Sequence, residues 1–287
     1  MLEDWYKKNY MKLLFIPLIA FVIAIAVIGV HYNTYGDFIK KDITLAGGTS
    51  VTIETEQAIN IEELDLLLEK ELNEVSVRLL TDPATKTQQG LIIDTSETDT
   101  DKVLSVLSKF IMFETEDVSM ESTGPSLGES FYKDLLLTLS IAFLLMAISV
   151  FVSFRTAIPS LAVISAALMD VIITVAIVDM LGMRIAAGGV VAFLLVIGYS
   201  IDTDILLSTK MLKQGEGSSF ERIISAAKTG LMMTLTTLVA LTVGFFVSFN
   251  PLLKQMFLII IIALFIDIFT TYFTNASILY RYAEKRK

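Results

Sequence analysis

Long uninterrupted runs of apolar residues dominate the hydropathy pattern of this chain. A run of about 20 apolar residues lets a helix cross the ~30 Å hydrocarbon core of a bilayer. Runs close to this length predict six transmembrane helices. They cover residues 13–30, 135–154, 158–181, 185–207, 231–249 and 256–280.

The first apolar run has two interpretations. It follows three lysines, and Ala24-Ile25-Ala26 has the small-x-small form of a signal-peptide cleavage site. The run nevertheless continues without a charge through Val30, so it is long enough to span the membrane. We therefore expect an uncleaved first helix.

Residues 32–130 have the mixed pattern of a soluble α+β domain. Alternating, β-branched stretches predict four strands, and helically spaced leucines and valines predict two helices. The strands cover residues 43–54, 75–80, 90–94 and 113–119; the helices cover 61–73, after Asn60, and 100–110, after Asp99 or Thr100; a turn is expected at 81–83. The order β-α-β-β-α-β predicts a ferredoxin-like domain.

These patterns divide the chain into three parts. Residues 1–31 form a cytoplasmic N-terminus and the first membrane helix, residues 32–130 an extracytoplasmic domain, and residues 131–287 a five-helix bundle with a cytoplasmic C-terminus. Lysine and arginine favour the cytoplasmic side of a membrane. With the N-terminus inside, the inner segments hold 12 of them, and the short outer loops hold only Arg184 and Lys254.

Composition and charge narrow the function classes. Hydrophobic residues make up 54% of the chain and charged residues 18%, which excludes an ordinary soluble enzyme. With no cysteine and one histidine, the chain has no thiolate or His-cluster metal site and no Ser-His-Asp triad. Residues 32–132 carry 20 acidic and 7 basic side chains, and an acidic face argues against nucleic-acid binding.

Asp170, Asp202, Asp204 and Asp267 fall within the predicted membrane helices. Asp170 and Asp267 lie about 12 residues from the cytoplasmic ends of their helices, roughly 18 Å deep, with Asp202 and Asp204 nearer the cytoplasm. A carboxyl group facing lipid costs several kcal/mol, so these side chains are expected to face the bundle interior or water. They are our candidates for a proton or cation relay. The alternative is that they only lock helix packing through hydrogen bonds.

Hydroxyl and small side chains accompany these acids. Threonines recur at helical spacing in the fifth and sixth helices, and we expect them to join helices by hydrogen bonds or to share in the relay. They are Thr234, Thr236, Thr237, Thr270, Thr271 and Thr274. Gly198 is expected to permit close packing, and His31 to act as an interfacial anchor.

Five short motifs, in order along the chain, resemble the SecF subunits of SecDF protein-export complexes, which are similar to resistance-nodulation-division transporters. The motifs are Ala46-Gly47-Gly48-Thr49, Gly124-Pro125-Ser126-Leu127-Gly128, Met169-Asp170-Val171, Ile197-Gly198-Tyr199-Ser200-Ile201 and Thr234-Leu235-Thr236-Thr237-Leu238. The resemblance covers essentially the whole chain. It implies structural roles for the motif glycines and Pro125, and a supporting polar role for Tyr199, Ser200, Thr236 and Thr237.

The sequence departs from the bacterial pattern in the fourth helix. Bacterial members continue Asn-Asp-Thr where this chain has Asp202-Thr203-Asp204, and their Phe-Asp-Arg is replaced near Ser208-Thr209-Lys210. The inner-leaflet charge pair of the bacterial relay is therefore not reproduced. With the acidic composition, these changes resemble an archaeal member.

The resemblance implies a subunit that joins a SecD-like partner in the cell membrane. Together they would promote late translocation of a polypeptide through the Sec translocon, driven by the proton-motive force through the aspartates. No bond-breaking activity, metal or cofactor is implied. The alternatives are a self-contained efflux or lipid transporter of the same superfamily, or a non-transporting scaffold for the translocon.

Overall fold

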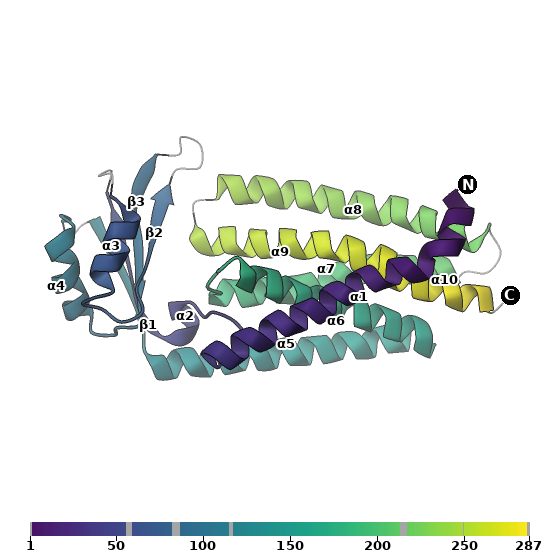
Figure 1. Ribbon diagram of the computed structural model, residues 1–287, viewed down its shortest axis with the longest axis horizontal. Helices are drawn as coiled ribbons and strands as arrows, with labels where there is room; N and C mark the ends of the chain where they lie inside the picture. The colour runs from purple at the N-terminus through teal and green to yellow at the C-terminus, as the bar shows by residue number, and fades with distance from the viewer. Residues whose placement is uncertain are drawn as a thin grey trace.

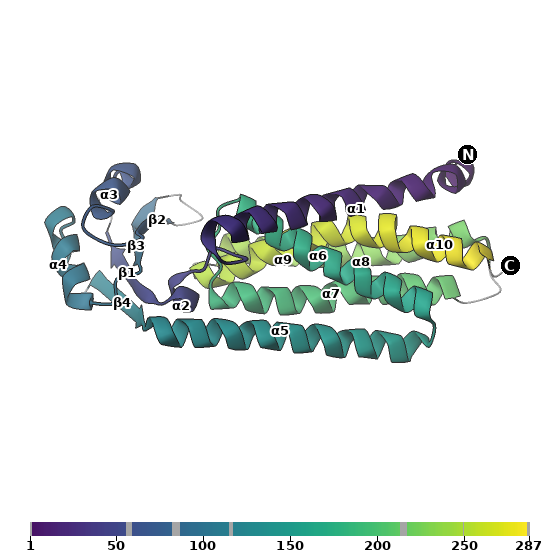
Figure 2. The same ribbon diagram turned by 60° about the horizontal axis from the view of Figure 1, so that its bottom comes forward.

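The computed structural model describes residues 2–55, 59–81, 87–114, 117–212, 217–248 and 250–285. Figure 1 shows two parts, a bundle of long helices and a small α+β domain at one end of it. The two chain termini lie together at the opposite end of the bundle (Figures 1 and 2). The α+β domain, which we call the outer domain, is therefore separated from the termini by the length of the membrane helices.

Six helical segments in the described chain are long and apolar enough to cross a membrane, which confirms the six predicted spans. The sixth span is interrupted by a π-helical segment, η2. The spans are α1 (Leu2–Tyr35), α5 (Pro125–Phe154), α6 (Ala157–Met180), α7 (Ala187–Leu212), α8 (Ser219–Val247), and α9 (Pro251–Phe269) continued by η2 (Thr270–Asn275) and α10 (Ala276–Lys285). The chain is thus a multi-pass membrane protein.

Local signals explain where two of these helices begin. The Ser218 hydroxyl accepts a hydrogen bond from the Glu221 N–H, and the Glu221 carboxylate accepts one from the Ser218 N–H, which forms a capping box for α8. Asn250 caps α9 by accepting from the N–H groups of Leu252 and Leu253. Pro251 then occupies the first helical turn, where no N–H is needed.

The outer domain is built on a four-stranded antiparallel sheet in the order β2-β3-β1-β4. Two helices, α3 and α4, lie on the face turned away from the bundle (Figure 1). The strands are β1 (Gly48–Glu54), β2 (Ser76–Thr81), β3 (Gln88–Thr95) and β4 (Val118–Thr123), and the helices are α3 (Ile61–Leu68) and α4 (Thr100–Phe110).

The core of the outer domain lies between the sheet and these helices. Val51, Ile53, Leu91 and Ile93 of the central strands are fully buried and belong to one cluster with residues of α3 and α4 such as Leu107. Each such side chain contributes about 1.5–3 kcal/mol when removed from water. The opposite face of the sheet carries polar side chains and faces the bundle.

Three predicted elements of the outer domain differ from the structure. The first strand begins at Gly48, because residues 43–46 form a short helix, α2 (Ile43–Ala46), capped by Asp42. Helix α3 ends at Leu68 instead of residue 73. The last strand covers residues 118–123, where it pairs with β1, instead of 113–119. The predicted turn lies largely outside the described residues.

Two motif glycines place the outer domain against the bundle. Gly47 has a φ of 85°, and a Cβ atom there would lie 2.4 Å from the Cα of Pro125. A Cβ atom on Gly128 would lie 2.7 Å from the backbone N of Gly47. The start of α5 and the turn before β1 therefore touch backbone to backbone, which only glycine permits.

The chain before α2 also joins the outer end of the bundle. The N–H of Asp42 donates to the carbonyl of Ile185 at 3.0 Å, and the N–H of Ile185 donates to that of Lys40 at 2.7 Å. This pair of bonds ties the linker after α1 to the segment between α6 and α7.

Candidate functional site

Asp170 lies in the interior of the bundle, between three membrane segments. Its carboxylate on α6 accepts hydrogen bonds from Ser200 on α7 and Thr270 on η2, each at 2.5 Å. Its backbone carbonyl accepts from Thr174 at 2.6 Å. Asp170 has no exposed surface. Ser200, predicted as a supporting residue, therefore contacts Asp170 directly.

Asp267 on α9 is the second buried carboxylate, with 2% of its surface exposed. It accepts from the Thr203 hydroxyl at 3.0 and 3.2 Å, and from the Thr271 hydroxyl at 3.2 Å. Thr203 occupies the position that the family resemblance aligns with the bacterial aspartate. In this chain it binds an aspartate from another helix.

Asp204 on α7 is the third buried carboxylate of the group. Its Oδ1 accepts from the Thr271 hydroxyl at 2.8 Å and from the Asn275 amide at 2.7 Å. Thr271 therefore lies between Asp204 and Asp267. Among the described residues, nothing donates to Asp204 Oδ2 or to the Oδ1 of Asn275. We call Asp170, Asp204 and Asp267 with these partners the carboxylate cluster.

The π-helical segment η2 supplies much of this cluster. Thr270, Thr271 and Asn275 all lie in η2 and are all buried. A π-helical turn changes the direction of side chains relative to an α-helix, and such turns are frequent at functional sites. The hydroxyl pattern indicated these threonines, whereas Asn275 had no signal except its place on the same helix face.

Asp202 lies outside the carboxylate cluster. It is an exposed residue of α7, on the face that also carries Gly198 and Tyr199. Its neighbours Thr203 and Asp204 are buried, because successive residues of a helix point about 100° apart. Asp202 and Asp204, two residues apart, therefore occupy different environments.

Thr236 and Thr237 also lie apart from the cluster. Both are on α8, and their hydroxyls donate to the carbonyl of Met233 in the same helix, at 2.8 and 3.1 Å. Of the motif threonines there, only Thr234 is buried, and its hydroxyl donates to Gly230.

The carboxylate cluster has no internal cation in the described parts of the chain. The lysine and arginine ion pairs there involve other acids, in the outer domain or at helix ends. Nor do the described residues include a group of three His, Cys, Asp or Glu side chains able to hold a metal ion. The cluster instead consists of carboxylates surrounded by hydroxyl and amide donors.

His31, expected to act as an interfacial anchor, belongs to a second buried polar pair. Its Nδ1 lies 2.9 Å from Oδ1 of Asp179, at the outer end of α6, and both side chains are under 10% exposed. Sequence reasoning did not single out Asp179, because a lone acid near a helix end is common on a solvated surface.

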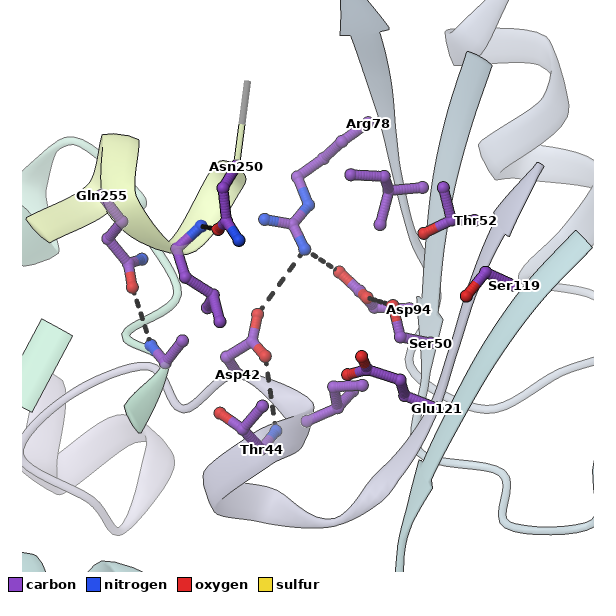
Figure 3. A pocket seen from close by; sticks show the side chains of 14 residues that line it. Asp42, Thr44, Ser50, Thr52, Arg78, Asp94, Ser119, Glu121, Asn250 and Gln255 are labelled. Atoms are coloured by element: carbon purple, nitrogen blue, oxygen red, sulfur yellow. Dashed lines mark hydrogen bonds and ion pairs between the residues drawn. The ribbon is translucent and has the colours of Figure 1, made fainter. Parts of the chain in front are cut away.

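A polar cavity of about 200 Å³ lies between the open face of the sheet and the bundle (Figure 3). Arg78 on β2 pairs with the buried Asp94 on β3 and reaches Asp42 at 3.6 Å. Burial, and then the negative charge of Asp94, raise the pKa of Asp42. Arg78 therefore connects the sheet to the segment that is bonded to the bundle.

Comparisons with known proteins agree with the sequence resemblance. The family model for the C-terminal region of the protein-export membrane proteins SecD and SecF matches residues 102–285. The protein-export membrane protein SecF of Methanolacinia petrolearia is 32% identical over 94% of this chain and 93% of its own. That of Methanocaldococcus jannaschii is also 32% identical, over 96% of both chains.

Solved structures support the fold. The crystal structure of SecDF from a Thermus species superposes with a TM-score of 0.77 and 19% identity, covering 98% of this chain and 38% of that one. SecDF in a super-membrane-facing form gives a TM-score of 0.59 with 20% identity, again over 38% of its chain. The chain thus spans well under half of each SecDF. By its sequence and its family match, the chain belongs to the SecF proteins of the SecD/SecF family of protein-export membrane proteins.

Proposed function

We propose that the chain is a SecF-like subunit that promotes late translocation of exported polypeptides through the Sec translocon, together with a SecD-like partner. We propose further that a proton gradient drives this work through Asp170, Asp204 and Asp267. The protein-export names of its relatives support the general role. The carboxylate cluster supports the ion coupling.

One observation supports the proposed coupling to a proton gradient: three buried carboxylates converge on one hydrogen-bonded network. Thr271 donates to both Asp204 and Asp267. Its neighbour Thr270 donates to Asp170. Three negative charges in a low-dielectric interior are very costly unless they are compensated. With no lysine or arginine paired to them in the described chain, protons or another small cation are the natural compensation. Loading and release of that cation would constitute the relay.

A SecD-like partner is supported by the exposed face of α7. Asp202 lies on this face beside Gly198 and Tyr199, within a helix long and apolar enough to span the membrane. A carboxyl group exposed to lipid costs several kcal/mol. A second bundle that covers the face would remove this cost and could bring a cation to Asp202.

The orientation and the outer domain form part of the proposal. The distribution of lysine and arginine supports cytoplasmic termini and an extracytoplasmic outer domain. The sheet order β2-β3-β1-β4, with α3 and α4 on one face, supports a ferredoxin-like domain between the first two membrane helices. We retain residues 1–31, 32–130 and 131–287 as the three parts of the chain.

Asp170→Asn is the variant that tests the coupling. Asn keeps the size of Asp and one of its two acceptor oxygens but does not ionise. We expect normal membrane insertion and normal recovery of the SecD-like partner, with loss of the stimulation of export. Thr174→Val is the matched control, because the Thr174 hydroxyl donates to the backbone carbonyl of Asp170 and not to its carboxylate. It should retain export.

The measurements are export of a secreted reporter, protein abundance and partner recovery in the same cells. Unimpaired export by Asp170→Asn would refute the relay role of Asp170. Recovery of a homo-oligomer that exports small molecules, without a SecD-like protein, would favour the self-contained transporter. Intact export after neutral substitution of all three clustered acids would favour the scaffold.

A further inference from the structure

Strand β4 forms one edge of the outer sheet, and its outer side has no partner among the described residues. It pairs with β1 alone. An edge strand presents unpaired N–H and C=O groups that can template the addition of another strand. Its sequence, Val118-Ser119-Met120-Glu121-Ser122-Thr123, contains no proline or lysine that would block such pairing.

The opposite edge is protected in a way that β4 is not. On β2, the N–H of Val77 donates to the Asp65 carboxylate of α3 at 3.2 Å. This bond occupies a backbone donor that points away from the sheet. In the described part of the domain, no side chain caps the outer backbone of β4 in the same manner. Among the described residues, a side chain therefore occupies an outward backbone donor on the β2 edge of the sheet but not on the β4 edge.

The register identifies which groups of β4 point outward. Thr55 follows β1, and its N–H donates to the carbonyl of Gln89 on β3, so its backbone groups point toward β3. Along an antiparallel strand, successive residues turn their backbone groups to opposite sides. Ser50 and Thr52 of β1 therefore turn their backbone groups toward β4. Their partners there are Glu121 and Ser119. The remaining residues, Val118, Met120 and Ser122, direct their N–H and C=O groups outward.

The two faces beside this edge have different chemistry. On the helix face, a groove of about 360 Å³ is lined by Leu104, Ser105, Ser108, Phe113, Val118 and Met120. On the open face, Ser119 and Glu121 line the polar cavity with Asp42 and Asp94 (Figure 3). That cavity holds three carboxylates and one guanidinium, Arg78, which already pairs with two of the three.

We infer that the outer edge of β4 docks an extended polypeptide in which apolar residues alternate with basic residues. The backbone of the peptide would bond to Val118, Met120 and Ser122. Its apolar side chains would enter the groove beside α4, and its basic side chains would approach Glu121 on the open face. Strand addition of this kind draws affinity from the main chain and specificity from alternate side chains. The occupant's identity as an exported chain, still extended outside the membrane, rests on the proposed function.

The test uses the full-length protein in lipid nanodiscs and two labelled synthetic peptides. One alternates valine and arginine, and the other has the same composition in two blocks. We expect the peptide with valine and arginine in two blocks to bind at least roughly tenfold more weakly than the alternating peptide, because its side chains do not match the two faces. Equal binding of both peptides would show simple charge attraction and overturn the inference.

A backbone variant tests the edge itself. Met120→Pro removes an outward donor, a position where proline is tolerated in an edge strand. It should abolish the preference for the alternating peptide, whereas Met120→Val, which keeps the donor, should retain it. Circular dichroism and thermal unfolding check that both variants fold.

N-methylated peptides give a test that leaves the protein unchanged. Methylation of either the valine set or the arginine set removes donors from one edge of the peptide. We expect antiparallel addition, in which methylation of the valine set abolishes binding and methylation of the arginine set does not. If both methylated peptides bind as well as the parent peptide, strand addition is refuted.

Two results separate this inference from the proposed function. Loss of export stimulation in Asp170→Asn with intact peptide binding would leave the β4 site in place, because peptide binding needs no ion gradient. If Met120→Pro loses the SecD-like partner from membranes without a change in peptide binding, the edge belongs to the partner's domain and the inference is overturned.

Discussion

Asn275 on η2 donates its side-chain amide to Oδ1 of Asp204 on α7, across a 2.7 Å hydrogen bond that joins the fourth and sixth membrane spans. The other oxygens of the two groups, Asp204 Oδ2 and Asn275 Oδ1, receive no donor from the described residues. Two buried acceptors without a donor cost free energy. We therefore propose this end of the cluster as the place where a proton or a cation binds.

Asp204→Asn distinguishes uptake of a cation from a packing role. Asn keeps an acceptor for Thr271 and Asn275 and replaces Oδ2, the acceptor that has no donor among the described residues, by an amide nitrogen. We expect an unchanged or raised thermal unfolding midpoint, with reduced export stimulation. Asp204→Leu should instead destabilise the protein by about 1–3 kcal/mol, since it leaves the buried amide of Asn275 without its acceptor, whereas Thr271 keeps Asp267. Export by Asp204→Asn at the wild-type level would exclude a relay role for this residue.

Asp202 allows a test of the α7 face as a subunit interface. Asp202→Leu replaces an exposed carboxyl group within a membrane span by an apolar one. Abundance of the chain should stay the same or rise, while recovery of the SecD-like partner falls roughly tenfold through loss of a buried polar contact. Ser140→Leu, at an exposed position of α5, is the control and should leave recovery intact. Equal partner recovery in both variants would contradict the interface.

The membrane helices and the order of strands and helices in the outer domain were predictable because each rests on a local pattern. Apolar runs determine the spans, and period-two or helical spacing determines the strands and helices. The first strand was placed wrongly at residues 43–46, since Ile43 and Leu45 are apolar at strand spacing. There the Asp42 side chain, capping the N–H of Thr44, starts a short helix instead.

The composition of the carboxylate cluster was only partly predictable. The free-energy cost of a carboxyl group facing lipid indicated Asp170, Asp204 and Asp267. The same argument indicated Asp202, which lies on the exposed face of α7. No local pattern fixes which face of a helix meets its neighbours. Asn275 and the π-helical turn depend on packing between spans distant in sequence.

Gly47 and Gly128 should be required for the junction between the outer domain and the bundle. Alanine at either position places a Cβ atom within 2.7 Å of the backbone of the other segment. We expect each substitution to lower stability by about 1–3 kcal/mol, through displacement of the start of α5. Gly124→Ala is the control, because a Cβ atom there meets nothing within 4 Å. Equal unfolding midpoints for the three variants would contradict this account of the motif.

A single cysteine tests the orientation, since the chain has no native cysteine. Met112 follows α4 in the outer domain and is 92% exposed, so Met112→Cys should not disturb the core. An impermeant thiol reagent should label it in intact cells. Trp5→Cys, at the exposed start of α1, should be labelled only after lysis. The reverse pattern would invert the proposed topology.

Asp42 should make the stability of the outer domain depend on pH. Burial and the nearby charge of Asp94 raise its pKa in the folded protein, so the folded state binds this proton more tightly than the unfolded state. The resulting stability is fully present below the unfolded pKa of about 3.9 and is lost as pH rises through the raised folded pKa.

Asp42→Asn removes this titration and keeps the oxygen that accepts from Thr44. We therefore expect the variant's gain in unfolding midpoint over the wild type to be largest near neutral pH and to shrink on acidification. Thermal unfolding of both proteins between about pH 4 and 7 measures this difference. A difference that does not vary with pH would mean that the Arg78 ion pair compensates the burial of Asp42 in full.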